Sequence, residues 1–119
     1  MRRKIDGDTL HVVDGSDNAI LTIKVKKADE ITTLEVSGAI THDAAPEFED
    51  ELMSVLTSGH NVAVDFSDVE HMSAPALDAL LTVQRLVDEN RFKFYIQNIS
   101  GAVKDTFEQT GFIELLEIR

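Results

Sequence analysis

The sequence predicts an α/β fold, with a single mixed, mainly parallel sheet and about three helices from βαβ crossovers. Two observations support this prediction. Strand-like and helix-like segments alternate between residues 31 and 98, and the helix-like segments are long enough to cross back over a sheet. Crossovers of this kind are right-handed and place the strands that they connect parallel to each other.

The segment before the crossovers is expected to be antiparallel. Residues 20–25 alternate apolar and polar side chains, and residues 31–37 are rich in β-branched residues, a pattern typical of a hairpin. Residues 1–18 are a polar lead in which only residues 9–13 resemble a strand. We therefore expect one domain over residues 19–119, preceded by a lead that is either an extra edge strand or a loose tail.

The first crossover helix is expected over residues 44–58. Asp43 is its predicted N-cap, Pro46 suits the first turn, and Gly59 suits the left-handed residue after the end. Residues 61–66 then form an apolar strand. The apolar residues of the helix recur with helical spacing at Phe48, Leu52, Val55 and Leu56.

The remaining residues predict a second crossover and a third helix. An apolar face at helical spacing follows a polar loop, and serine and glycine mark the two ends of the last helix. The expected elements are a loop at 67–72, a helix at 74–89, a strand at 92–98, a helix between Ser100 and Gly111, and a short strand at 115–118.

Composition excludes several classes of function. The chain has no cysteine, which excludes disulfides and thiolate chemistry and favours a reducing compartment, so we expect a cytoplasmic protein. A formal net charge of -11 disfavours nucleic acid. The basic Met1–Lys4 start is followed by acidic residues and not by the apolar run of an export signal, and no segment suits membrane insertion. The oligomeric state is left open.

The expected topology gathers polar residues at one rim of the sheet, where three strand-to-helix loops meet, at residues 38–43, 67–74 and 98–101. No pair of histidines has ligand spacing, no strained G-x-S-x-G turn is present, and Ser100–Gly101 alone does not make a phosphate loop. We therefore expect a binding protein and not an enzyme, with no catalytic residue, metal or cofactor. The loops contribute Thr41, His42, Asp43, Asp68, His71, Met72, Ser73 and Pro75.

Three segments resemble STAS domains, specifically the bacterial anti-sigma-factor antagonists. They are residues 34–41, residues 62–69, and residues 100–112. The last segment is the most specific, because it resembles the family pattern S-x-A-V-x-x-x-F-x-x-[ST]-G without a gap. The resemblance covers residues 19–118 and implies a domain that docks on an anti-sigma factor, which is also a kinase, and is released when a serine at the head of the second helix is phosphorylated.

The expected phosphorylation motif departs from the family pattern. In register with D-S-[ST]-G-[LIV], this chain has Ser73, Ala74, Pro75, Ala76 and Leu77, so only the last position is kept. Alanine has no hydroxyl, and the usual charge switch cannot operate there. Ser73 is a candidate phosphoacceptor one residue earlier, although a role as helix N-cap is better supported.

The resemblance predicts a protein-interaction module whose partner is an anti-sigma factor or a related kinase-like regulator. Met72 and Leu77 are expected to supply apolar contact, and the acidic residues are expected to match a basic patch. Two alternatives stay open: a non-phosphorylatable STAS scaffold in a signalling or transport assembly, and a small-ligand or nucleotide binder. The expected partner-binding residues are Thr41, His42, Asp43, Asp68, Glu70, His71, Met72, Ser73, Ala74, Pro75, Ala76, Leu77 and Asp78.

Overall fold

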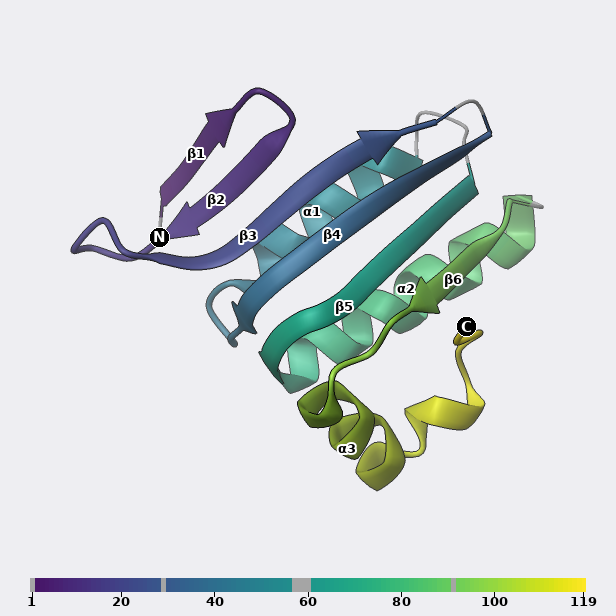
Figure 1. Cartoon of the computed structure of the whole chain (residues 1–119). Coiled ribbons are helices and arrows are strands. Elements are labelled where there is room, and N and C mark those ends of the chain that lie inside the picture. Colours follow the sequence, from purple (N-terminus) through teal and green to yellow (C-terminus); the bar gives the residue numbers. More distant parts are fainter. Residues whose placement is uncertain (1, 29, 57–60, 91) are drawn as a thin grey trace.

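The computed structural model describes residues 2–28, 30–56, 61–90 and 92–119. In this part of the chain, a six-stranded mixed sheet has the strand order β1-β2-β3-β4-β5-β6. Helices α1 (Ala45–Leu56) and α2 (Ala74–Asn90) cover one face of the sheet, and α3 (Gly101–Thr110) lies beyond β6 (Figure 1). The predicted α/β class is confirmed.

The first four strands are antiparallel. They are β1 (Arg2–Asp6), β2 (Thr9–Val13), β3 (Ala19–Lys27) and β4 (Ile31–Ile40). The polar lead is therefore a hairpin and not a loose tail, and its second strand buries Leu10 and Val12 in the core. Sequence reasoning missed β1 because it is exposed along its whole length and has no buried face to produce a pattern. The parallel part of the sheet is correspondingly smaller than expected.

Three of the described strands pair in parallel. β5 (Asn61–Met72) pairs parallel with β4 on one side and with β6 (Phe94–Gln97) on the other. The predicted loop at residues 67–72 is wrong, because the strand continues through it in register with the end of β4. Both crossover helices are confirmed within a few residues, although Gly59 lies outside the described residues.

The core lies between the sheet and the helices on its covered face. Phe48 of α1 and Phe66 of β5 are fully buried, with ring centroids 6.0 Å apart and planes tilted by 51°. Tilted aromatic pairs of this kind add specific contact energy to the apolar area that they bury. They join the first crossover helix to the central parallel strand. Within the described residues, no helix is long and apolar enough to cross a membrane.

The ends of α3 follow the sequence closely. Ser100 is the N-cap, with its Oγ accepting a hydrogen bond from the Val103 backbone N–H at 3.2 Å. The same Oγ donates to the Val69 carbonyl oxygen at 2.6 Å, which fastens the start of the helix to β5. Gly111 follows the last residue with φ 80°, the left-handed conformation that glycine adopts without strain. Both predicted ends are confirmed.

The last predicted strand is wrong. After α3 the chain forms a short 3-10 helix, Phe112–Glu114, and then contributes a single parallel bridge between Ile118 and Ile96 of β6. Leu115 is 58% exposed, whereas Leu116 is buried. One buried side chain and a few backbone hydrogen bonds hold the segment. Its apolar residues resemble a strand in sequence, but they do not form one.

Gly38 is required by close packing near the end of β4. Its φ is 98°, and a Cβ atom at this position would lie only 2.4 Å from the Ile20 carbonyl oxygen on the neighbouring strand β3. The β4 to β5 register shifts between Gly38 and Ala39, immediately before the strand ends. Glycine therefore allows the irregularity that precedes the rim.

We expect Gly38→Ala to destabilise the domain by roughly 2 kcal/mol or more, because the methyl group adds a backbone clash to a strained φ. Urea unfolding measures the change. Gly15→Ala is the matched control, because a Cβ atom there meets nothing within 4 Å and the φ is not positive. Equal stability of the two variants would contradict this account of Gly38.

Candidate functional site

The rim is built where β4 and β5 end together. Ile40 is in register with Met72, the last residue of β5. One residue later, the Ser73 backbone N–H donates to the Ile40 carbonyl oxygen at 3.0 Å, which fixes the start of α2 against the end of β4. The first turn of α2 then closes when the Leu77 N–H donates to the Ser73 carbonyl oxygen at 3.1 Å.

A short capped turn forms the other half of the rim, between β4 and α1. Thr41 Oγ1 accepts a hydrogen bond from the Ala44 N–H at 3.1 Å, and the Thr41 carbonyl oxygen accepts one from the Ala45 N–H at 3.0 Å. Thr41 therefore performs the capping that was expected of Asp43. The sequence prediction failed because the turn begins two residues earlier, which leaves the Asp43 side chain exposed.

The rim presents an acidic surface. We use the name acidic tip for His42, Asp43, Glu70, His71, Ala74 and Asp78, all of which are exposed. Thr41 and Pro75 are half-buried beside it. In the described part of the chain, none of its three carboxylates forms an ion pair. The tip therefore carries uncompensated negative charge that is accessible to a partner.

The prediction that Met72 and Leu77 offer apolar contact to a partner at the rim is wrong. Met72 is 4% exposed and Leu77 is 5% exposed, and Ala76 is fully buried, so all three side chains belong to the core. They anchor the start of α2 on the sheet, and this packing accounts for their apolar character. A partner that docks on the folded domain meets charge and backbone at this site, and not these side chains.

Ser73 is buried and unpartnered. It is 9% exposed, and its Oγ has no hydrogen-bond partner. The predicted side-chain N-cap is therefore wrong, although its backbone carbonyl accepts the first helical hydrogen bond. A kinase requires an accessible hydroxyl, so modification of Ser73 would need this junction to open.

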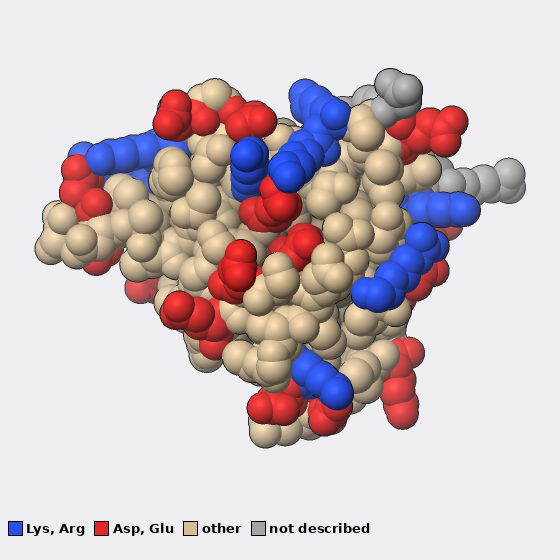
Figure 2. Space-filling view, in the orientation of Figure 1, with Lys and Arg blue, Asp and Glu red and all other residues tan. Residues whose placement is uncertain are grey.

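Asp68 is exposed on β5, two residues before Glu70 of the acidic tip. It pairs in register with Ser37 and lines a polar groove of about 240 Å³ on the face of the sheet that α1 and α2 leave uncovered. Figure 2 shows this face, on which basic and acidic side chains are interspersed. Sequence reasoning missed the groove because it ended β5 at residue 66. The groove is lined by Thr9, Thr22, Lys24, Glu35, Val36, Ser37, Asp65, Ser67 and Asp68.

Asp65 is a carboxylate of this groove that accepts several hydrogen bonds. It accepts hydrogen bonds from the Ser67 N–H at 2.9 Å, the Ser67 Oγ at 2.7 Å and the Asn98 Nδ2 at 2.9 Å. Partial burial raises the pKa of Asp65, but hydrogen bonds from Asn98, Ser67 and Gln97 outweigh burial and hold the pKa below its ordinary value. The carboxylate joins β5 to the turn before α3.

The third expected loop, residues 98–101, packs along β5 beside the acidic tip. The Ser100 N–H donates to the Phe66 carbonyl oxygen at 3.2 Å, and the Ser100 Oγ donates to the carbonyl oxygen of Val69, the residue before Glu70. β6 ends in register with Asp65, seven residues before β5 ends. The carboxyl ends of the parallel strands are staggered, so the third loop meets β5 before its last residue.

The site contains no recognisable catalytic arrangement among the residues that the structure describes. No group of three or more histidine, aspartate or glutamate side chains is placed to hold a metal ion. In the described part of the chain, His42 and His71 form no hydrogen bond that would orient either of them as a base.

Residues 22–119 match the STAS domain. The chain belongs to the STAS domain family. Its STAS region begins within β3, so the β1 and β2 hairpin lies before the matched residues.

Relatives of this STAS domain carry a regulatory name. The anti-sigma-B factor antagonist of Staphylococcus epidermidis is 24% identical over 99 residues, which cover 82% of this chain and 92% of the relative. The protein with the same name from Staphylococcus aureus (strain NCTC 8325 / PS 47) is 23% identical with the same coverage.

Solved structures support the STAS fold. An anti-sigma factor antagonist from Mycobacterium paratuberculosis has a TM-score of 0.75 at 19% identity and covers 90% of this chain and 89% of its own. The Bacillus cell fate determinant SpoIIAA in its phosphorylated form has a TM-score of 0.63 at 13% identity, with 82% and 90% covered. At these identities the likeness concerns the fold.

We expect Asn98→Gly to raise the pKa of Asp65 toward its ordinary value, because it removes one donor while glycine tolerates the φ of 55° at this position. A carboxylate with a lowered pKa stabilises the fold above its unfolded-state pKa, and this contribution disappears as pH falls through the folded-state pKa. The native chain and the variant should therefore differ more in stability near neutral pH than in acid.

Carboxyl NMR titration measures the Asp65 pKa directly, and urea unfolding across pH measures the linked stability. Asn18→Gly, in an exposed turn, is the control and should leave the Asp65 pKa unchanged. An unaltered Asp65 titration in Asn98→Gly would show that the amide does not hold this carboxylate.

Proposed function

We propose that this STAS domain is a protein-interaction module that docks on an anti-sigma factor or a related kinase-like regulator. Its curated relatives are named anti-sigma-B factor antagonists, and the match to them covers most of both chains. The observation that carries the proposal is the acidic tip, in which a core-anchored helix start is surrounded by exposed, unpaired carboxylates.

Charge complementarity is the proposed basis of recognition. Asp43, Glu70 and Asp78 come from three different segments that the end of the sheet holds together. Rigid placement matters, because a preorganised surface loses less conformational freedom when it binds. A basic patch on the partner fits this surface and would be steered toward it, since opposite charges raise the association rate at low salt.

Regulation is the respect in which this domain departs from the family pattern. Ala74 is exposed at the first position of α2, where the family motif places a serine, and it offers no oxygen to a kinase. The neighbouring hydroxyl of Ser73 is buried. We propose that docking by this domain is not controlled by phosphorylation at the α2 start.

We expect the double variant Ala74→Arg and Asp78→Lys to weaken binding to an anti-sigma factor from the same host by roughly tenfold or more, because it adds bulk and reverses charge at the acidic tip. Both side chains are exposed, so the fold should persist. Calorimetric titration of the separately purified proteins measures the dissociation constant.

Glu89→Lys is the matched control, because it reverses an exposed charge near the other end of the same helix. It should bind as the native chain does. Equal binding by the double variant would exclude the acidic tip as the docking surface. Absence of binding by the native chain to every anti-sigma factor of the host would instead favour the scaffold alternative.

We also expect the protein purified from its host to carry no phosphate on residues 73–78, because the exposed acceptor is absent and the remaining hydroxyl is buried. Intact-mass measurement followed by peptide mapping tests this expectation. Stoichiometric phosphate on Ser73 would overturn the proposed loss of regulation and would show that the β5 to α2 junction opens.

A further inference from the structure

The outer edge of β1 is the most exposed strand edge that the structure describes. β1 is the terminal strand of the sheet, and every residue from Arg2 to Asp6 is exposed. A terminal strand presents unpaired backbone groups that can accept another strand. The β1 hairpin also precedes the residues that match the STAS domain, so this edge is an addition to the family region.

The backbone hydrogen bonds show which residues of β1 face outward. The Val25 N–H donates to the Asp8 carbonyl oxygen at 2.9 Å, so Asp8 directs its backbone groups toward β3. Backbone direction alternates along a strand, and Thr9 therefore faces β1, where its register partner is Asp6. The same alternation along β1 directs the N–H and C=O groups of Ile5 and Arg3 away from the sheet.

The charges on the two sides of Ile5 have opposite signs, so they are complementary when two β1 strands pair antiparallel. An antiparallel pair of β1 strands centred on Ile5 sets Lys4 of each copy opposite Asp6 of the other. Centring on Lys4 would oppose two lysines, and centring on Asp6 would oppose two aspartates. Like charges directly opposite each other destabilise a strand pair, so only the register at Ile5 is free of them.

Ile5 is also the side chain that a second strand would cover best. It is 74% exposed, the largest exposed fraction among the large apolar side chains described. It lines the open side of a groove of about 470 Å³ between the hairpin and α1, together with Leu10, Val25 and Val55. Contact between two Ile5 side chains would remove apolar surface from water at the centre of the pair.

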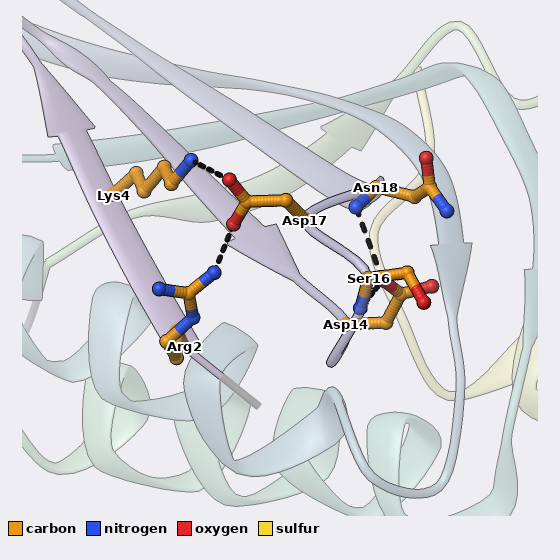
Figure 3. A network of polar contacts seen from close by, with 6 residues as sticks. All are labelled: Arg2, Lys4, Asp14, Ser16, Asp17 and Asn18. Atoms are coloured by element: carbon orange, nitrogen blue, oxygen red, sulfur yellow. Dashed lines mark hydrogen bonds and ion pairs between the residues drawn. The ribbon is translucent and has the colours of Figure 1, made fainter.

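Ion pairs within the chain hold β1 in place but leave its Arg2 and Lys4 side chains largely exposed. Arg3 Nε lies 3.0 Å from Glu47 Oε2 of α1, an ion pair without hydrogen-bond geometry, and Arg3 Nη2 lies 3.3 Å from Glu51 Oε2. Arg2 and Lys4 both contact Asp17 of the β2 to β3 turn (Figure 3). The Arg2 and Lys4 side chains are still 62% and 50% exposed.

The acidic half of the pattern is accessible as well. Asp6 and Asp8 are exposed, and neither forms an ion pair among the described residues. Asp6 therefore gains an opposite charge from Lys4 of a second copy. Charged edges usually discourage pairing with unrelated strands. Here the opposite charges on the two sides of Ile5 would favour antiparallel pairing with β1 of a second copy.

We propose that two copies of this chain associate through antiparallel pairing of their β1 strands, with Ile5 opposite Ile5 on the two-fold axis. The two sheets then form one continuous twelve-stranded sheet, twice the six strands of one copy. The strand is short, so the dimer is small in contact area and reversible. The acidic tips lie at the ends of β4 and β5 and stay free, so the proposal does not depend on the proposed partner.

Cysteine trapping tests the register, because the chain has no cysteine of its own. We expect Ile5→Cys to form a covalent dimer rapidly under mild oxidation, since directly opposed residues lie within the Cα separation that a disulfide requires. Leu115→Cys is the control, at an exposed apolar residue far along the chain. Equal crosslinking rates for the two variants would overturn the proposal.

Mixing of charge variants tests the same register without a covalent bond. Lys4→Asp alone and Asp6→Lys alone each set like charges opposite each other, so each should weaken self-association by roughly tenfold in sedimentation equilibrium. An equimolar mixture of K4D and D6K restores opposite charges at both positions and should form a mixed dimer.

The protein should be free of an N-terminal tag in these measurements, and circular dichroism should confirm that each variant is folded. A native chain that stays monomeric over the whole concentration series, with no Ile5→Cys crosslink, would overturn the proposal. So would a dimer that neither charge variant weakens, because its contact would then lie elsewhere on the surface.

Discussion

The parallel pairing of β4 with β5 through their last residues is the constraint on which the site depends. Ile40 and Met72 end the two strands together, and the hydrogen bond from the Ser73 N–H to the Ile40 carbonyl oxygen starts α2 at that point. Gly38 makes the approach feasible, since a side chain there would meet β3. The positions of Asp43, Glu70 and Asp78 follow from this junction.

The division between buried and exposed residues at the junction determines the kind of partner that fits. The apolar residues of the α2 start are used inside the domain, and the polar residues that flank them are left in water. Surface charges of this kind contribute more to selectivity and association rate than to affinity. An exchangeable contact with a basic partner is consistent with such a surface, and a tight apolar interface is not.

The hairpin before the STAS region adds a second surface at the other end of the sheet. Figure 1 shows β1 and β2 at the edge opposite β6, apart from the end of β5 where α2 begins. The acidic tip carries unpaired acids, and the β1 edge carries alternating charges around an exposed isoleucine. A domain with both surfaces could present two acidic tips from one assembly, which increases effective concentration toward a multivalent partner.

The sequence by itself determined the class of fold, the crossover helices and both ends of α3, because helical spacing, Ser100 and Gly111 act locally. It also indicated the STAS family, most specifically from the ungapped segment at residues 100–112. Only the tertiary structure decided that β5 continues to Met72, that Thr41 and not Asp43 caps the turn, and that Leu77 is buried. Strand length and burial depend on neighbours that are distant in the chain, and a strand such as β1, with no buried face, leaves no local pattern from which to predict it.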